Sequence, residues 1–302
     1  MSIASRIDRP IFVIGTGRCG STIIFEALAL HEDLGWFSNY NEKLPRVGIV
    51  SVLPRIYDLP LLSKVLPRGE KPQFKQGQSR LNRLLPKPSE CYPKWELMCG
   101  RKFRDDYLLG VEATEGEKSR VARSVLQVLK LQGKPRFAAK ITGPPRISYL
   151  SSIFPDARFV HIIREGKAVV NSWLNVDFWK ESSSYFEPRW KNGLPATWED
   201  EWKSYGSTPA ALAAIQYRNI LNVSRQEKAK LAANQYLEVS YEAFIANPEA
   251  VMKTILDFCQ LSHSSRVLSY ISRPGRYRNM NDKVSKAFSE QDLEALDALL
   301  SH

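Results

Sequence analysis

A short glycine-bearing loop, placed between an apolar run and a helical stretch, is the first feature of this sequence that could carry out chemistry. The apolar run Ile11–Ile14 leads into Gly15-Thr-Gly-Arg-Cys-Gly-Ser-Thr22. Glycine allows backbone conformations and close approaches that a Cβ atom forbids. The N–H groups of such a loop and of the helix start that follows it converge on an anion. Arg18 adds guanidinium donors, and Ser21 and Thr22 add hydroxyls. The pattern predicts a phosphate-binding loop.

The loop departs at one position from the phosphate loop of enzymes that use nucleoside triphosphates. In the pattern G-x-x-x-x-G-K-[ST], Gly15, Gly20 and Thr22 match, whereas Ser21 occupies the lysine position. That lysine contacts the β- and γ-phosphates and supports magnesium-dependent phosphoryl transfer. Its absence favours a ligand that carries less charge at its reacting end.

A second candidate anion site lies in the middle of the chain. The apolar run 158–163 ends at Arg164, and Ser172 follows about two turns into the next helical stretch. Because ligands bind at the carboxyl ends of parallel strands, we expect Arg164 to lie near the first loop. A guanidinium offers phosphate a bidentate pair of donors that lysine cannot copy. The alternative is an ion pair between Arg164 and a carboxylate such as Glu165.

Together these patterns resemble those of the sulfotransferases that use 3′-phosphoadenosine 5′-phosphosulfate (PAPS). The Gly15–Thr22 loop resembles the family's 5′-phosphosulfate loop R-S-G-[ST]-[ST], with Cys19 in place of the usual serine. Arg164 and Ser172 match the family's 3′-phosphate pattern R-[DE]-x-x-x-x-x-x-S. The stretch Phe154–Arg164, which leads into this site, and the later stretch Tyr236–Pro248 also resemble the family's sequence. The resemblance implies metal-free, in-line transfer of a sulfuryl group from PAPS to a hydroxyl or amine, leaving adenosine 3′,5′-bisphosphate.

The resemblance also implies which residues hold the donor. The expected phosphate ligands are Thr16, Gly17, Arg18, Cys19, Gly20, Ser21, Thr22, Arg164 and Ser172. Tyr236 could approach the nucleotide, although core packing is the role that we favour for it. Arg276 and Arg278 belong to a late basic stretch, and in the family such a loop folds over the 3′-phosphate; we favour solvated arginines over this role.

Candidates for catalysis are less sharply defined. Lys140 ends an apolar run and precedes Thr142-Gly-Pro-Pro145. This stretch resembles the family's K-x-P segment near the acceptor, although here a glycine and an extra residue interrupt it. Lys140 could stabilise the transferring group, or be a surface lysine. For the base we favour Glu42, which follows the second expected strand. The competing candidates are Glu112, Glu115, His31 and His161, the last expected to be a core histidine.

Apolar runs that alternate with helical stretches predict the elements that position these residues. Strands are expected over Ile11–Ile14, Leu34–Phe37, Leu108–Ala113, Arg136–Ile141, Arg158–Ile163 and Gln235–Val239. Helices are expected over Ser21–Leu30, Lys118–Leu131, Arg146–Phe154, Lys167–Val176, Pro209–Ala232, Pro248–Cys259 and Glu290–Leu300. This alternation predicts an α/β fold: a central parallel sheet flanked by helices, as in the three-layer sandwich of P-loop NTPases.

Two stretches interrupt the alternation, at about residues 41–104 and 177–208. We interpret them as irregular insertions on the acceptor side of a single domain spanning residues 1–302, the second ordered by its tryptophans. They could line a pocket for a small-molecule, carbohydrate or lipid acceptor.

Composition narrows the function classes. A net charge of +11 indicates anionic partners, but no block of like charges marks a nucleic-acid-binding arm. The four cysteines form no C-x-x-C pair, so neither a metal site nor a disulfide framework is expected. No apolar run reaches about eighteen residues and no signal peptide is evident, which predicts a cytoplasmic protein without a membrane span. The alternatives are a P-loop kinase or NTPase and a non-catalytic nucleic-acid-binding protein.

Overall fold

The computed structural model describes residues 3–59, 84–176, 179, 186–190, 192–272, 279, 281 and 288–301. Its centre is a five-stranded sheet in the order β2-β3-β1-β4-β5, and every neighbouring pair is parallel. The strands are β1 (Ile11–Gly15), β2 (Leu34–Gly35), β3 (Arg136–Thr142), β4 (Arg158–Ile163) and β5 (Tyr236–Ser240). The carboxyl end of β1 therefore lies between those of β3 and β4, where an α/β sheet binds its ligands.

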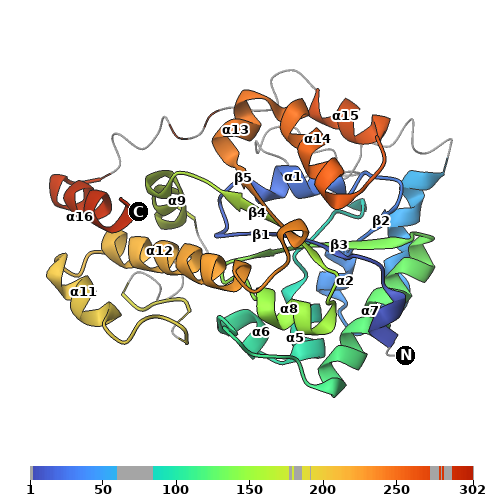
Figure 1. The fold of residues 1–302 in the computed structure, drawn as a ribbon, viewed down its shortest axis with the longest axis horizontal. Coiled ribbons are helices and arrows are strands. Elements are labelled where there is room, and N and C mark those ends of the chain that lie inside the picture. The colour runs from blue at the N-terminus through green and yellow to red at the C-terminus, as the bar shows by residue number, and fades with distance from the viewer. Residues whose placement is uncertain are drawn as a thin grey trace.

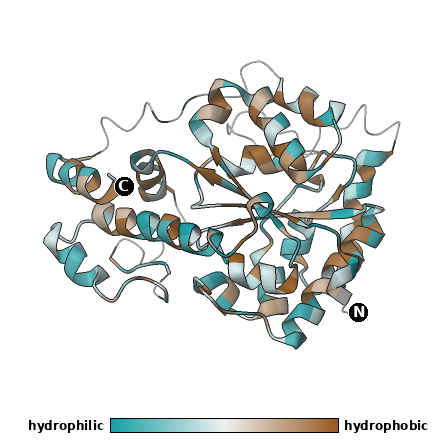
Figure 2. Ribbon diagram, viewed as in Figure 1, coloured by the Kyte–Doolittle hydropathy of each residue, from teal (hydrophilic) through white to brown (hydrophobic). Residues whose placement is uncertain are grey.

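Helices cover both faces of this sheet (Figure 1). Because side chains alternate along a strand, Phe12 and Ile14 of β1 pack into one apolar cluster, whereas Ile11 and Val13 pack into another. Figure 2 shows the apolar strands enclosed between helices whose outer faces are hydrophilic. The central parallel sheet with helices on both faces confirms the predicted fold class.

The helices fall into three groups. On one face lie α1 (Ser21–Leu28), α13 (Tyr241–Ala246), α14 (Pro248–Cys259) and α15 (Ser265–Ile271). On the other lie η1 (Ile3–Arg6), α2 (Asn39–Lys43), η2 (Gly48–Asp58), α5 (Tyr92–Cys99), α6 (Lys102–Asp105), α7 (Glu115–Gln132) and α8 (Ile147–Ile153). Beside the sheet, α9 (Gly166–Leu174), α11 (Trp198–Ser204), α12 (Pro209–Lys228) and α16 (Glu290–Leu300) share a third cluster, and the short turn η4 (Ala233–Gln235) precedes β5.

The strand expected over Leu108–Ala113 is wrong. Leu108 and Gly110 both have left-handed backbone conformations, with φ of 54° and 67°. A strand needs φ near −120°, so two such residues interrupt an extended run. The segment forms a turn that leads into α7 instead.

The two insertions contain more regular structure than expected. The described part of the first one forms η2, α5 and α6, and the buried Trp95 of α5 stacks on Phe103 of α6 with ring centroids 4.8 Å apart. In the second one, Trp179 and Trp190 pack against Trp173 of α9, with centroids 4.7 and 6.1 Å from its ring. Aromatic side chains thus anchor both insertions to the body of the fold.

A buried carboxylate fixes the helix that follows β3. Glu227 of α12 is 0% exposed and accepts hydrogen bonds from the backbone N–H groups of Ile147 and Ser148, at 2.9 and 3.0 Å. These N–H groups open α8, whose own N-cap makes no side-chain hydrogen bond. The contact replaces that missing cap and orients the turn after β3.

We expect Glu227→Gln to lower the free energy of unfolding by about 2 kcal/mol, because an amide oxygen accepts only part of what the buried carboxylate accepts. Chemical denaturation measures the loss. Glu294→Gln, at an exposed position of α16, serves as the matched control and should change stability by less than about 0.5 kcal/mol. Equal stabilities for the two variants would contradict this role of Glu227.

Candidate phosphate-binding site

The loop after β1 has a backbone that glycine makes possible. Gly17 and Gly20 adopt φ of 81° and 86°, in the left-handed region. A Cβ atom on Gly20 would lie 2.4 Å from Cδ2 of Tyr241, so this position is closed to any larger residue. Arg18 also has a positive φ, of 56°, which costs a non-glycine residue on the order of 1 kcal/mol. The chain maintains a strained turn directly before α1.

The backbone donors of this turn have no acceptor in the part of the protein that the structure describes. Among the described residues, the N–H groups from Gly17 to Thr22 make no hydrogen bond to another protein atom. Cys19 and Ser21 are buried, so the turn is packed into the fold rather than extended into solvent. Unpaired N–H groups ahead of a helix form a concave, positively polarised surface that suits an anion.

Two arginines and a serine meet at one side of the loop. Nε of Arg18 donates to Oγ of Ser172 at 2.9 Å, and Nη1 of Arg164 donates to the carbonyl of Arg18 at 2.8 Å. Burial lowers the pKa of Arg18, and the neighbouring charge of Arg164 lowers it further. Neither guanidinium forms an ion pair with a carboxylate in the described part of the chain. Two adjacent cations without an anionic partner favour binding of a multiply charged anion.

The position of Arg164 is fixed from several sides. Its Nε donates to Oδ1 of Asn281 at 2.9 Å, and its guanidinium lies 4.5 Å from the centroid of the Tyr241 ring. Glu242 accepts from the N–H of Glu165 at 3.0 Å and from Nδ2 of Asn281 at 2.9 Å. Glu165 forms no ion pair with Arg164. The structure therefore does not support the alternative in which Arg164 pairs with this carboxylate.

Lys140 brings a third cation to the loop from the adjacent strand β3. It is only 4% exposed, so it is not a surface lysine. Its Nζ donates to Oγ1 of Thr22 at 2.8 Å and lies 2.8 Å from Oε1 of Glu90. The other oxygen of Glu90 accepts from Oγ1 of Thr142 at 2.9 Å. An ammonium group therefore adjoins the loop although residue 21 is a serine.

Glu90 was not identified from the sequence. It lies in the first insertion, in a stretch without a motif, and reaches Lys140 only because the chain folds back from position 90 to β3. Glu42, the base favoured from the sequence, is exposed on α2 and accepts a hydrogen bond from the hydroxyl of Ser89. Glu42 thus contacts Ser89, the residue before Glu90, and Lys140 pairs with Glu90 rather than with Glu42.

The remaining candidate bases lie in other surroundings. Glu112 and Glu115 are exposed, and Glu115 pairs with Lys118 at 2.9 Å. The buried His31 lies 3.0 Å from the carbonyl oxygen of Ser262. His161 is buried as expected, and burial lowers its pKa to about 3, which keeps it neutral.

One of the expected donor ligands, Tyr236, lies away from the loop. Tyr236 is the first residue of β5, at the amino-terminal edge of the sheet, where its hydroxyl hydrogen-bonds His161. The loop lies at the opposite, carboxyl edge, so Tyr236 is a core residue and its placement at the nucleotide is corrected. Arg276 and Arg278 lie outside the described residues. Thr16 is buried at the end of β1.

The described residues contain neither a cluster of metal-ligating side chains nor a helix that could span a membrane. No group of three or more His, Cys, Asp and Glu side chains in this part of the chain is placed to hold a metal ion. Within the same residues, no helix has the length and apolar character needed to cross a membrane.

Comparison with known proteins gives one family. The model of the sulfotransferase family matches residues 117–265, a span that includes Lys140, Arg164 and Ser172 but begins after the loop. Protein-tyrosine sulfotransferase 2 of Gallus gallus is 24% identical over 189 residues, which are 59% of this chain and 44% of that protein. The chain thus matches less than half the length of this relative.

Solved structures show the same fold. Sulfotransferase STF1 from Mycobacterium tuberculosis H37Rv superposes with a TM-score of 0.56 at 17% identity, over 97% of this chain and 77% of the other. Sulfotransferase STF9 from Mycobacterium avium gives a TM-score of 0.58 at 16% identity, over 98% and 76% of the two chains.

Proposed function

We propose that this chain is a sulfotransferase that transfers a sulfuryl group from PAPS to a hydroxyl or amine of its acceptor, as its similarity to the sulfotransferase family supports. The observation that carries this proposal is the contact of Arg18 with both Ser172 and Arg164 beside unpaired loop N–H groups. PAPS carries anionic groups at both its 5′ and 3′ ends. The proposal assigns the loop, from Thr16 to Thr22, to the 5′-phosphosulfate, and Arg164 with Ser172 to the 3′-phosphate.

We assign roles in the transfer step to Lys140 and Glu90. In the proposed reaction, the acceptor oxygen or nitrogen forms a bond to sulfur while the bond from sulfur to the 5′-phosphate oxygen breaks. Adenosine 3′,5′-bisphosphate leaves, and its new negative charge is stabilised by the ammonium of Lys140 and by the loop N–H groups. The acceptor's proton passes to a carboxylate, for which we propose Glu90 because it already shares Lys140. Glu42, which accepts a hydrogen bond from the hydroxyl of Ser89, is the second candidate for this base.

The first alternative, a P-loop kinase or NTPase, is less well supported. Its lysine position is occupied by Ser21, although Lys140 supplies an ammonium from β3. The proposed contact with a 3′-phosphate gives Arg164 and Ser172 a role, whereas a nucleoside triphosphate has no 3′-phosphate for them to bind. The second alternative, a nucleic-acid-binding protein, is consistent with the net charge of +11. It gives no role to the Gly15–Thr22 loop, which is packed into the fold.

Thermal shift with three ligands separates these functions. We expect adenosine 3′,5′-bisphosphate, at about 100 times its dissociation constant, to stabilise the protein by about 2.7 kcal/mol, which is a shift of several degrees. ATP with magnesium and a mixed-sequence oligonucleotide should shift the melting temperature far less. A larger shift with ATP–magnesium would favour the kinase, and a shift with the oligonucleotide alone would favour nucleic-acid binding.

A further inference from the structure

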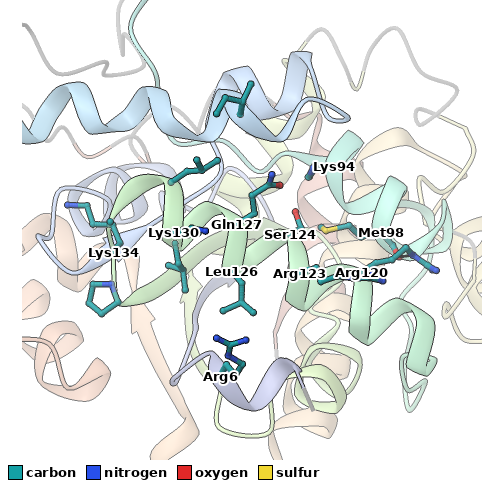
Figure 3. A pocket seen from close by; sticks show the side chains of 15 residues that line it. Arg6, Lys94, Met98, Arg120, Arg123, Ser124, Leu126, Gln127, Lys130 and Lys134 are labelled. Carbon is teal, nitrogen blue, oxygen red and sulfur yellow. Dashed lines mark hydrogen bonds between the residues drawn. The ribbon is translucent and has the colours of Figure 1, made fainter. Parts of the chain in front are cut away.

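An open groove with a basic lining runs along α7, apart from the loop (Figure 3). Its volume is about 1250 Å³, and its walls come from η1, η2, α5 and α7. It has six cationic lining residues and no Asp or Glu among the lining residues that the structure describes. The cationic residues are Arg6, Lys94, Arg120, Arg123, Lys130 and Lys134.

Three basic side chains and one glutamine lie in a stripe along one face of α7. Arg120, Arg123, Gln127 and Lys130 follow each other at intervals of three or four residues, so they share one face of the helix. The opposite face, with residues such as Val121 and Val125, is buried in the core. The stripe is therefore held rigidly by the packing of α7, and Arg120, Arg123 and Lys130 are exposed.

Little negative charge compensates this stripe. Lys134 pairs with Asp58 at 2.9 Å, but Arg6, Arg123 and Lys130 form no ion pair with any carboxylate in the described part of the chain. Lys94 donates to the carbonyl of Pro45 at 2.7 Å, and burial lowers its pKa. Several cations that share one hollow repel each other, so an anionic occupant relieves the repulsion.

We propose that this groove binds an acidic polypeptide segment that also carries apolar side chains. The cations recognise its carboxylates, and the apolar lining residues Ile49, Leu126 and Leu131 accept its aliphatic side chains. Mixed charge and apolar contact are typical of docking surfaces for extended peptides.

Other occupants fit the lining less well. None of the described lining residues is aromatic, whereas single-stranded nucleic acid is held by stacking on aromatic rings. A hollow surface does not match a flat bilayer. A second copy of this chain, with a net charge of +11, does not complement the groove. The chain's own residues 60–83 are also basic, with Lys64, Arg68, Lys71, Lys75, Arg80 and Arg83 against Glu70.

The groove is separate from the proposed donor site. Lys134 and Pro135, at one end of it, lead into the amino terminus of β3, whereas the Gly15–Thr22 loop lies at the carboxyl edge of the sheet. The proposal therefore does not depend on the chain being a sulfotransferase, and either can fail without the other.

Fluorescence anisotropy with a fluorescein-labelled peptide of repeated Glu-Leu-Glu-Gly units tests the proposal. We expect the wild-type protein to bind it and the double reversal Arg123→Glu/Lys130→Glu to bind it at least roughly tenfold more weakly. The affinity should also fall as salt rises from 50 to 200 mM, since the Debye length shortens to below about 10 Å.

A matched double reversal controls for total charge. Lys253→Glu/Arg225→Glu changes the net charge equally on α14 and α12, away from the groove, and should bind the peptide nearly as the wild type does. Binding of adenosine 3′,5′-bisphosphate should be unchanged by Arg123→Glu/Lys130→Glu, which also reports that the variant is folded. Absent peptide binding, or an equal loss in both double variants, would overturn the proposal. So would tighter binding of an oligonucleotide, a heparin fragment or phosphatidylserine vesicles that Arg123→Glu/Lys130→Glu abolishes.

Discussion

Glu90→Gln should lower kcat by about 10²- to 10⁴-fold while leaving the affinity for adenosine 3′,5′-bisphosphate nearly unchanged. The amide keeps the shape of the side chain, and its oxygen can still accept from Lys140 or Thr142, which Glu90 contacts at 2.8 and 2.9 Å. It cannot accept a proton from the acceptor. Transfer of ³⁵S from labelled PAPS to acceptors in a cell extract measures the rate, and calorimetry measures the affinity.

The pH profile distinguishes a base from a structural carboxylate. If Glu90 accepts the proton, the wild-type rate falls at low pH as the carboxylate is protonated, and this acid limb is absent from Glu90→Gln. Glu42→Gln is the matched control, because it makes the same substitution at the carboxylate that accepts from Ser89, the residue before Glu90. A loss of activity in Glu42→Gln together with a normal Glu90→Gln would assign the base to Glu42 instead.

Arg164→Lys should weaken the binding of adenosine 3′,5′-bisphosphate by about 10- to 100-fold although the positive charge is retained. The guanidinium spans the carbonyl of Arg18 at 2.8 Å and Oδ1 of Asn281 at 2.9 Å, and it lies over the Tyr241 ring. An ammonium cannot hold these directions together and still present a fork of donors to a phosphate. Isothermal titration calorimetry measures the change.

The matched substitution for this test is Arg225→Lys, at an exposed position of α12 remote from the loop. It should leave the bisphosphate affinity unchanged. Were Arg164→Lys to bind the bisphosphate as tightly as Arg225→Lys does, the assignment of Arg164 to the 3′-phosphate would be wrong.

The features that the sequence predicts well are local ones. The buried run of β1, the glycines after it and the start of α1 are contiguous, so their pattern determines the strand, the turn and the helix without long-range information. The expected proximity of Arg164 to the loop follows from the rule for parallel strands, and its 2.8 Å contact with Arg18 confirms it. Its role as a phosphate ligand stays a prediction.

The features that the sequence misses depend on contacts between distant segments. Glu90 pairs with Lys140, which lies fifty positions further along the chain, and no local pattern encodes the path of the insertion that brings them together. Tyr236 could approach the nucleotide as judged from the sequence, but it is the first residue of β5 and so lies at the amino-terminal edge of the sheet, opposite the loop. Leu108–Ala113 has the composition of a strand, but its left-handed residues are set by the turn into α7.

Calorimetric comparison of adenosine 3′,5′-bisphosphate with 5′-AMP tests most directly the claim that this site holds the donor by both of its ends. The two ligands differ only in the 3′-phosphate, which the account assigns to Arg164 and Ser172 beside Arg18. We expect the bisphosphate to bind at least about 100-fold more tightly, since charge-assisted hydrogen bonds to one phosphate contribute about 1.5–3 kcal/mol each. Equal affinities for the two nucleotides would contradict the account.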